Sequence, residues 1–329
     1  MNHPQPELDD AVRRLRSGRL VAFPTETVYG LGALALNGEA VARVFAAKGR
    51  PASNPLIVHV LDEAMARRVT GAWPMAARRL ASAFWPGPLT LVLPAGAGVP
   101  SAVTAGGPGV AVRSPDHPLA LALFRAVGEP LVGPSANRSG AVSPTLASHV
   151  REAFDPGEVL VLDGGACRVG LESTVLSLMD PARPVILRPG MIGAAAIAEV
   201  LGIAVGEGEG TDGHAGSPGR LGPHYRPSAP VHLVETLSAL DEAMVSSTGA
   251  CVVLTPPGLP VAVEPPHEAI VMPSDASAYA ARLYAALREA DAAQPTWILV
   301  CRPPASGQRP EETAIWQAVH ERLTRASTP

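Results

Sequence analysis

The 329-residue chain has few cysteines, few aromatic residues and few charges, and each shortage excludes a class of protein. Its cysteines, Cys167, Cys251 and Cys301, are far apart and form no C-x-x-C pair, so they predict neither a zinc site nor a disulfide framework. Charged residues make up 17% of the chain and aromatic residues 4%, with 26 Lys and Arg against 30 Asp and Glu. A surface that grips nucleic acid broadly is basic. We therefore expect no stable direct binding to nucleic acid, and any bound anion should be small and held by a few local cations.

The sequence also lacks a long uninterrupted apolar run. Its most apolar stretch, residues 189–205, contains Gly193, Glu199 and Gly202, so it predicts a helix and a strand rather than a membrane span. The N-terminal segment, MNHPQPELDD, is polar and has no signal-peptide core. Together with the scattered, unpaired cysteines, these features predict a cytoplasmic protein without membrane attachment.

The hydrophobic pattern predicts two α/β domains. Over residues 1–205, short apolar segments alternate with helical patterns, which is typical of an α/β domain. Residues 206–228 are rich in glycine and nearly free of apolar residues, as linkers are, and residues 229–329 return to a strand and helix pattern of normal domain size. The first domain is expected to have strands at 19–24, 56–60, 89–94, 109–115, 130–136, 159–165, 173–179 and 185–190, and helices at 8–17, 39–47, 75–85, 117–128 and 193–201.

The segment FPTETVYGLGALA (residues 23–35) has two interpretations. Thr25 or Thr27 could cap the start of a helix. Alternatively, their hydroxyls could face a polar ligand at the end of strand 19–24, where open α/β sheets bind ligands. Gly30-x-Gly32 adds little to a nucleotide-binding interpretation because the third glycine of a dinucleotide fingerprint is missing.

The segment KGRPASNPLIVHV (residues 48–60) also has two interpretations. As a helix C-terminus, it would use Gly49 as the left-handed cap, with Lys48 and Arg50 near the negative helix end. As a phosphate-binding loop, it would use the planar fork of Arg50 and the movable charge of Lys48. The first interpretation leaves Asn54, and His59 within an apolar strand, unexplained, although a lone histidine in a strand is usually a satisfied core residue.

Two further segments carry candidate binding residues. Arg113 ends the apolar strand GVAVR and would suit a carboxylate if it faces a cleft, although a surface arginine is the common alternative. The segment GPSANRSGAVSPT (residues 133–145) is either a turn-rich loop or a loop whose hydroxyls and amides line a nucleotide. There is no G-x-S-x-G motif for a serine nucleophile, and no histidine pair has metal-ligand spacing.

Seven segments, in this order, resemble the YrdC family of threonylcarbamoyl-AMP synthases over about residues 10–205. They are PTETVYGLG, KGRPASNPLIVHV, WPGPLTLVLP, VAVRSPDHP, PLVGPSANRSGAVSPT, GLESTV and LRPG. The family's signature pair corresponds to Lys48-x-Arg50 and Ser135-x-Asn137. The linker and the C-terminal unit resemble the two-domain form of the family. This resemblance implies a twisted YrdC-like α/β domain with a concave basic cavity, followed by a smaller Rossmann-like α/β domain.

The resemblance also implies an activity. The family condenses L-threonine, bicarbonate or carbon dioxide, and ATP into threonylcarbamoyl-AMP and pyrophosphate, which is a nucleotidyl transfer. Mg²⁺ would be bound by the ATP phosphates and not by protein side chains. Partner proteins would transfer the threonylcarbamoyl group to tRNA. Lys48 and Arg50 would be catalytic, near the phosphates and the developing carbamate. By similarity, L-threonine would contact Thr27, His59, Arg113 and Ser173. ATP would contact Arg50, Asn54, Ser135, Asn137, Ser143, Arg188 and Tyr225.

One segment departs from the family pattern. The two-domain form carries a linker motif close to S-P-G-M-K-Y-R-H-Y-x-P, and here residues 217–227 read SPGRLGPHYRP. His224 and Tyr225 are kept, whereas residues 220–223 differ. We expect this linker to fold over the nucleotide as a lid. The rival interpretations are an RNA-binding translation factor, which the acidic charge balance disfavours, and a carbamoyltransferase, whose accessory metal-binding segments have no counterpart here.

Overall fold

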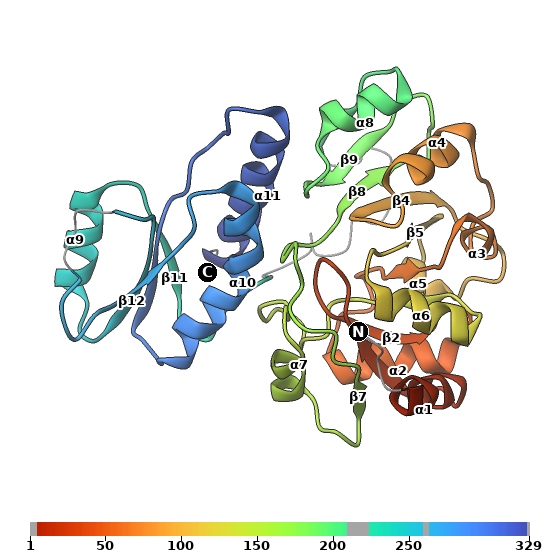
Figure 1. The fold of residues 1–329 in the computed structure, drawn as a ribbon, viewed down its shortest axis with the longest axis horizontal. Helices are drawn as coiled ribbons and strands as arrows, with labels where there is room; N and C mark the ends of the chain where they lie inside the picture. The colour runs from red at the N-terminus through yellow and green to blue at the C-terminus, as the bar shows by residue number, and fades with distance from the viewer. Residues whose placement is uncertain (1–4, 209–223, 259–262, 328–329) are drawn as a thin grey trace.

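Two separate β-sheets organise the chain in the computed structural model, which describes residues 5–208, 224–258 and 263–327 (Figure 1). The larger, mixed sheet has ten strands. In spatial order they are β10 (Gly206–Glu207), β9 (Val185–Arg188), β8 (Thr174–Ser177), β4 (Leu89–Pro94), β5 (Gly109–Arg113), β3 (Ile57–His59), β6 (Leu131–Val132), β2 (Gly30–Leu34), β1 (Leu20–Phe23) and β7 (Val159–Val161). Its helices are α1 (Gln5–Arg16), α2 (Gly38–Lys48), α3 (Glu63–Ala66), α4 (Met75–Phe84), α5 (Ser101–Thr104), α6 (Pro118–Val127), α7 (Ala147–Ala153) and α8 (Ala194–Leu201).

Helices cover both faces of the larger sheet. Strand β1 shows this, because its residues alternate between two apolar clusters. Val21 and Phe23 pack with α1 and α6, whereas Leu20 and Ala22 pack in the cluster that includes α2, α4, α7 and α8. A strand buried on both sides reads as a continuous apolar run, which is why LVAF was recognisable as a strand.

The parallel pair β3 and β5 brings two predicted site residues together. His59 and Arg113 are register partners at the carboxyl ends of these strands. Strand β4 runs antiparallel to β5, so the start of β4 and of its parallel neighbour β8 lies beside Arg113. The end of the sheet at which these segments meet is where binding residues were expected.

The segment that contains Gly30 and Gly32 forms strand β2, antiparallel to β1, with Phe23 opposite Gly30. The helix-cap interpretation of Thr25 and Thr27 is therefore wrong. A Cβ atom at Gly30 would lie 3.0 Å from the Phe23 ring, and one at Gly32 would lie 2.9 Å from the Val21 carbonyl oxygen. These glycines make room for close packing between two strands.

Helix α2 begins and ends as its sequence predicts. The Asn37 side chain accepts a hydrogen bond from the Ala40 amide at 3.1 Å, and Gly49 has φ 61° in the left-handed region at the C-terminus. The helix-end interpretation of residues 48–50 is thus confirmed, and it leaves the ligand-binding interpretation open. Throughout the described ranges, no helix has the length and apolar character that crossing a bilayer requires.

The smaller sheet is parallel throughout and belongs to the C-terminal domain. Its order is β11 (Val231–Val234), β14 (Trp297–Cys301), β12 (Cys251–Thr255) and β13 (Glu268–Val271). In Figure 1, α10 (Ala276–Ala292) and α11 (Pro310–Ser327) lie on the side of this sheet that faces the larger domain, and α9 (Leu237–Ser246) lies on the opposite side. The predicted combination of two α/β units is confirmed.

Apolar packing joins the two domains. Val28, Val142 and Leu171 of the larger domain belong to the same buried cluster as α10 and α11. Gly170 takes φ +74° at this contact, and a Cβ atom there would lie 2.5 Å from the Cα atom of Ala281 on α10. The close approach of α10 therefore depends on a residue without a side chain.

Candidate active site

A cavity opens at the ends of the central strands, beside the end of the linker. Eight of the residues predicted from the sequence line it: Thr27, Arg50, His59, Arg113, Ser135, Ser173, Arg188 and Tyr225. The other predicted residues, Lys48, Asn54, Asn137 and Ser143, are buried but do not line it. Three of the lining residues are arginines: Arg50, Arg113 and Arg188. The fold thus gathers at one cavity positive charges that lie up to about 140 positions apart in the sequence.

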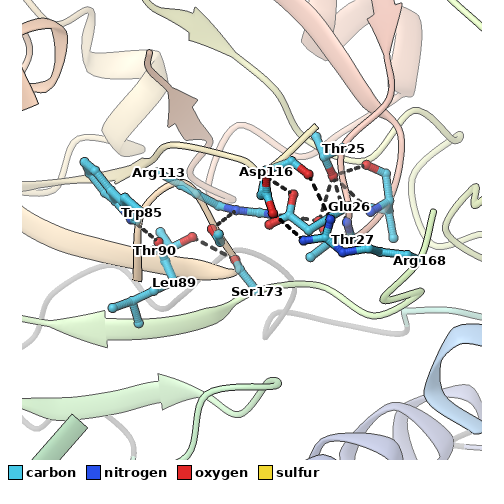
Figure 2. Close-up of polar contacts among 12 residues, drawn as sticks. Thr25, Glu26, Thr27, Trp85, Leu89, Thr90, Arg113, Asp116, Arg168 and Ser173 are labelled. Carbon is cyan, nitrogen blue, oxygen red and sulfur yellow. Dashed lines mark hydrogen bonds and ion pairs between the residues drawn. The ribbon is translucent and has the colours of Figure 1, made fainter. Parts of the chain in front are cut away.

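Arg113 is a buried residue, so the surface-arginine alternative is wrong. Its Nη2 atom lies 2.6 Å from Oε1 of Glu26, its Nη1 donates to the Thr27 hydroxyl at 2.9 Å, and its Nε donates to the Gly87 carbonyl at 3.1 Å. Figure 2 shows Arg113 extended toward Glu26 and Thr27. Its guanidinium is therefore held in one orientation, with an anion and a hydroxyl beside it.

His59 stands next to Arg113 and is surrounded by aromatic rings. It contacts Phe23 at 5.6 Å and Phe124 at 6.5 Å between ring centroids. Burial lowers the pKa of His59 well below its usual value, and the charge of Arg113 lowers it further. Among the described residues, its Nδ1 atom has no hydrogen-bond partner. His59 is thus a neutral ring that lines the cavity and has a buried polar atom without a partner among the described residues.

Lys48 joins the end of α2 to the hydroxyl-rich loop. Its Nζ atom donates to the carbonyl oxygens of Ser135 and Asn137, both at 2.6 Å. The side chain is buried, and burial together with the charges of Arg50 and Arg138 lowers its pKa well below the usual value. The two halves of the predicted signature pair are therefore in direct contact.

The loop after α2 orients Arg50. Its Nε donates to the Asn54 carbonyl at 3.1 Å, and its Nη2 donates to the Pro55 carbonyl at 2.8 Å. Burial lowers the pKa of Arg50 to about 10, which leaves it charged at neutral pH. The Asn54 side-chain oxygen is buried and has no partner within the described part of the chain. This loop thus presents a fixed cation and an unused acceptor.

Arg188 on β9 approaches the cavity beside Ser173. Its Nη2 donates to the Ser173 carbonyl at 3.0 Å and to the Ser173 hydroxyl at 3.3 Å. The same hydroxyl lies 2.7 Å from that of Thr90 on β4. Strands β9 and β4 and the residue just before β8 therefore fix this corner of the site.

Four polar or charged residues at the cavity or just behind it were not predicted from the sequence as site residues. Glu172 lines the cavity and accepts hydrogen bonds from Ser143 at 2.7 Å and Tyr284 at 2.8 Å. Arg322 lies 3.1 Å from the same carboxylate. Glu26, the partner of Arg113, is the fourth. Glu26 and Glu172 stand within the recognised motifs PTETVYGLG and GLESTV, whereas Tyr284 and Arg322 lie in a domain for which the sequence offered no site motif.

His224 and Tyr225 bring the end of the linker to the cavity. The Tyr225 backbone has φ +63°, and its ring stacks on that of Tyr284 at 5.4 Å. Residues 209–223, which include the altered positions 220–223, lie outside the described residues. The predicted closure of the linker over a nucleotide therefore stays a prediction.

Two family models match the chain. The Sua5–YciO–YrdC model, described as telomere recombination, matches residues 13–190, and the model of the threonylcarbamoyl-AMP synthase C-terminal domain matches residues 192–328. The chain belongs to the Sua5–YciO–YrdC family. It has the two-domain form of that family, as the sequence motifs predicted.

Similar members of the Sua5–YciO–YrdC family include two proteins named threonylcarbamoyl-AMP synthase. The one from Bacillus subtilis is 48% identical over 233 residues, which cover 70% of this chain and 67% of that protein. The one from Pyrococcus abyssi is 48% identical over 227 residues, which cover 67% and 66%. The aligned part thus spans about two thirds of these relatives.

The crystal structure of Pyrococcus abyssi Sua5 complexed with L-threonine has the same two-domain fold. It superimposes with a TM-score of 0.88 at 38% identity and covers 99% of this chain and 96% of that one. The predicted fold, a YrdC-like α/β domain followed by a smaller α/β domain, is confirmed.

Proposed function

We propose that this member of the Sua5–YciO–YrdC family is a threonylcarbamoyl-AMP synthase. It would condense L-threonine, bicarbonate or carbon dioxide, and ATP, and release pyrophosphate, as a nucleotidyltransferase. The observation that carries the proposal is the buried cavity in which Arg113 and His59, on neighbouring strands, face the same space as Arg50 and Arg188. The names of its relatives and the L-threonine in the Pyrococcus abyssi structure support the proposal.

The amino acid would bind at the corner formed by β3 and β5. Arg113 would pair with its carboxylate, because the Arg113 guanidinium is fixed by Glu26 and Thr27 and lines the cavity. The unused Nδ1 atom of His59 would meet the threonine hydroxyl. Ser173 completes this corner, where its hydroxyl already takes part in a chain with Thr90.

ATP would bind along the loops that carry the other cations. Arg50 and Arg188 would contact the phosphates, and Ser135 and Tyr225 also line this space. Asn54, Asn137 and Ser143 would contribute from just behind the lining, where Asn54 and Asn137 keep buried side-chain oxygens without partners among the described residues. Lys48 would hold the hydroxyl-rich loop in place and add positive charge near the reacting phosphate.

The reaction would proceed without a covalent enzyme intermediate. The threonine amine attacks carbon dioxide, forms a C–N bond and loses a proton to give a carbamate. A carbamate oxygen then attacks the α-phosphorus of ATP, and the bond to the β-phosphate oxygen breaks to release pyrophosphate. Fixed positive charge and orientation supply most of the acceleration in such transfers.

Mg²⁺ would be carried by the ATP phosphates, where it neutralises charge. The Glu172 carboxylate already bonds Ser143, Tyr284 and Arg322, so it is not available as a simple metal ligand. Within the described residues, no group of three or more His, Cys, Asp or Glu side chains could hold a metal ion. The proposal therefore gives the metal to the substrate and not to the protein.

The product would pass to separate proteins that transfer the threonylcarbamoyl group to tRNA. We propose a cytoplasmic location because ATP is present there and thiols stay reduced. The three cysteines of the chain are free, which suits that compartment.

The deciding experiment measures pyrophosphate release from ATP, Mg²⁺ and bicarbonate, with and without L-threonine. Serine serves as the matched amino acid that lacks only the methyl group. We expect release that depends on L-threonine, with threonylcarbamoyl-AMP as the nucleotide product detected by mass spectrometry. ATP turnover that is indifferent to threonine would overturn the proposal.

A further inference from the structure

The carboxylate of Glu172 lies in the wall of a cavity whose other charged groups are arginines. Glu172 lines the cavity together with Arg50 and Arg188, and only 10% of its side chain is exposed. A carboxylate at this place would repel the phosphates of ATP if its charge were left unbalanced. The larger domain supplies one hydrogen bond to it, from the Ser143 hydroxyl at 2.7 Å.

The C-terminal domain supplies the other partners of this carboxylate. The Tyr284 hydroxyl on α10 donates to Oε2 of Glu172 at 2.8 Å, and Nε of Arg322 on α11 lies 3.1 Å from the same oxygen. Arg322 is fully buried, and its Nη1 atom also contacts Glu321 at 2.6 Å. Burial alone would raise the pKa of Glu172, but the charges of Arg322 and, to a smaller extent, Arg188, with the hydrogen bonds from Ser143 and Tyr284, together outweigh burial and keep this pKa below its usual value. Glu172 is thus an anion whose main counter-charge comes from the other domain.

The same two residues hold the ring of Tyr225. Tyr225 and Tyr284 stack with an interplanar angle of 23°, and the Arg322 guanidinium carbon lies 5.7 Å from the centre of the Tyr225 ring. Tyr225 is buried and has a left-handed backbone, which a residue with a side chain adopts only when its surroundings hold it there. The positions of Glu172 and Tyr225 in the cavity lining therefore depend on the same two side chains, Tyr284 on α10 and Arg322 on α11.

We propose that Arg322 and Tyr284 are positioning residues for the nucleotide subsite, which they keep receptive to ATP by neutralising Glu172 and fixing Tyr225. The inference rests on the proposed function, because it assumes that the cavity binds ATP. It gives the C-terminal domain a defined part in catalysis, separate from any closure of the linker. It also predicts selectivity: loss of Arg322 should weaken ATP binding far more than threonine binding, because Arg113 and His59 lie at a different corner.

The test compares Arg322→Met, Tyr284→Phe and the double variant Glu172→Gln/Arg322→Met in the full-length protein. Methionine keeps much of the arginine's length without its charge, and phenylalanine keeps the ring that stacks on Tyr225. We measure KM for ATP and for L-threonine by pyrophosphate release, and Kd for ATP by calorimetry. Arg282→Met on the outer part of α10 is the matched control, because Arg282 makes an exposed ion pair with Glu289.

We expect Arg322→Met to raise KM and Kd for ATP by about 10–100-fold, as when one partner of a buried charge pair is lost. Tyr284→Phe should raise both by about tenfold, because it removes one hydrogen bond to a charged group. In the double variant, the uncompensated carboxylate is gone, so most of the affinity for ATP should return. KM for L-threonine should change far less, and Arg282→Met should behave like the wild type.

Equal increases in both KM values, or a double variant that stays as weak as Arg322→Met, would overturn the inference and indicate a general structural role. If Arg322→Met does not fold by circular dichroism, Tyr284→Phe decides, and an unchanged affinity for ATP refutes the inference. A wild-type protein that binds ATP but releases no pyrophosphate with threonine would refute the proposed function, whereas the calorimetric comparison would still test the positioning role.

Discussion

Arg113 and Glu26 form an ion pair of 2.6 Å in which both side chains are almost completely buried, at 4% and 0% exposure. The second oxygen of Glu26 accepts a hydrogen bond from the Asp116 amide at 3.0 Å, so the carboxylate is fixed by backbone as well. Glu26 therefore determines where the guanidinium of Arg113 points (Figure 2). A fixed arginine fork loses little conformational entropy when it binds a second carboxylate.

Replacing Glu26 by alanine should destabilise the fold strongly. The change leaves Arg113 buried without its anion, which costs about 3–5 kcal/mol. Chemical denaturation of Glu26→Ala measures the loss. Glu289→Ala is the matched control, because it removes a carboxylate from an exposed pair with Arg282 and should cost at most about 1 kcal/mol. Equal losses in the two variants would mean that the Arg113–Glu26 pair is not a buried one in solution.

Stability should fall as the pH drops below about 6.5, and His59 should contribute to this fall. The unfolded chain binds a proton at His59 near that pH, whereas burial and Arg113 keep the folded ring neutral to much lower pH. The stability that the neutral ring provides is therefore complete above this pH and is lost below it, at about 1.4 kcal/mol per pH unit. His149 and His224, whose pKa values burial lowers to about 4, act in the same direction.

The measurement compares the free energy of unfolding of the wild type and of His59→Phe across the acid range. Phenylalanine suits a site that already contacts Phe23 and Phe124. The variant should lose stability less steeply by about 1.4 kcal/mol per pH unit. Identical slopes would show that His59 is already protonated in the folded protein.

A methyl group at Gly170 should weaken the contact between the two domains. A Cβ atom there would lie 2.5 Å from Cα of Ala281, so α10 has to move. Gly165→Ala is the control: Gly165 also has a positive φ, of +80°, but an added Cβ would have no atom within 4 Å. Gly165→Ala should cost only about 1 kcal/mol of backbone strain. Gly170→Ala should lower the free energy of unfolding clearly more. It should also raise KM for ATP, because α10 carries Tyr284. Equal losses of stability in the two variants would contradict the tight interface.

A methyl group at Gly133 should disturb the corner proposed to bind threonine. A Cβ atom there would lie 2.6 Å from Nδ1 of His59 and 2.9 Å from the Phe23 ring, so the imidazole must shift. Gly133→Ala should raise KM for L-threonine by about tenfold and leave Kd for ATP nearly unchanged, since a lost hydrogen bond is worth about 1 kcal/mol or more. Gly38→Ala is the control, because an added Cβ there meets no atom within 4 Å. An unaltered KM for threonine would remove His59 from the proposed subsite.

Alanine at Lys48 or Arg50 should slow turnover by about 10²–10³-fold, since each change removes a fixed charge near the proposed position of the reacting phosphate. Both variants should also lose stability. Lys48→Ala leaves two buried carbonyl groups without their donor, which costs about 1–3 kcal/mol of unfolding free energy. Arg50→Ala likewise removes the donor to the buried carbonyl groups of Asn54 and Pro55. Near-normal turnover in both variants, measured by pyrophosphate release, would contradict their assignment to the site.

The sequence predicted the strands and most of the longer helices because their apolar residues keep a regular period. It did not reveal strand β2, since Gly30 and Gly32 look like a loop and belong to a strand only because Phe23 needs the space. The short helices α3, α5 and α7 were missed for a related reason, because each has too few turns to show a period.

The candidate site was predictable where its residues lie within continuous motifs. Arg113 and His59 were recognised because each is a polar residue in an apolar strand, and the structure makes them neighbours. Arg322 was not recognised, because an arginine in a helix normally faces water. Its burial follows from the docking of α11 against the larger domain, which no local pattern encodes.

Glu172 and Arg322 are separated by 150 residues along the chain. A ribosome builds the chain from its N-terminus, so the larger domain, with Glu172 in place, emerges well before the helix that carries Arg322. During that interval the cavity holds an anion without its main counter-charge. If Arg322 has the positioning role proposed above, the nucleotide subsite is completed only after the second domain has been made and has docked.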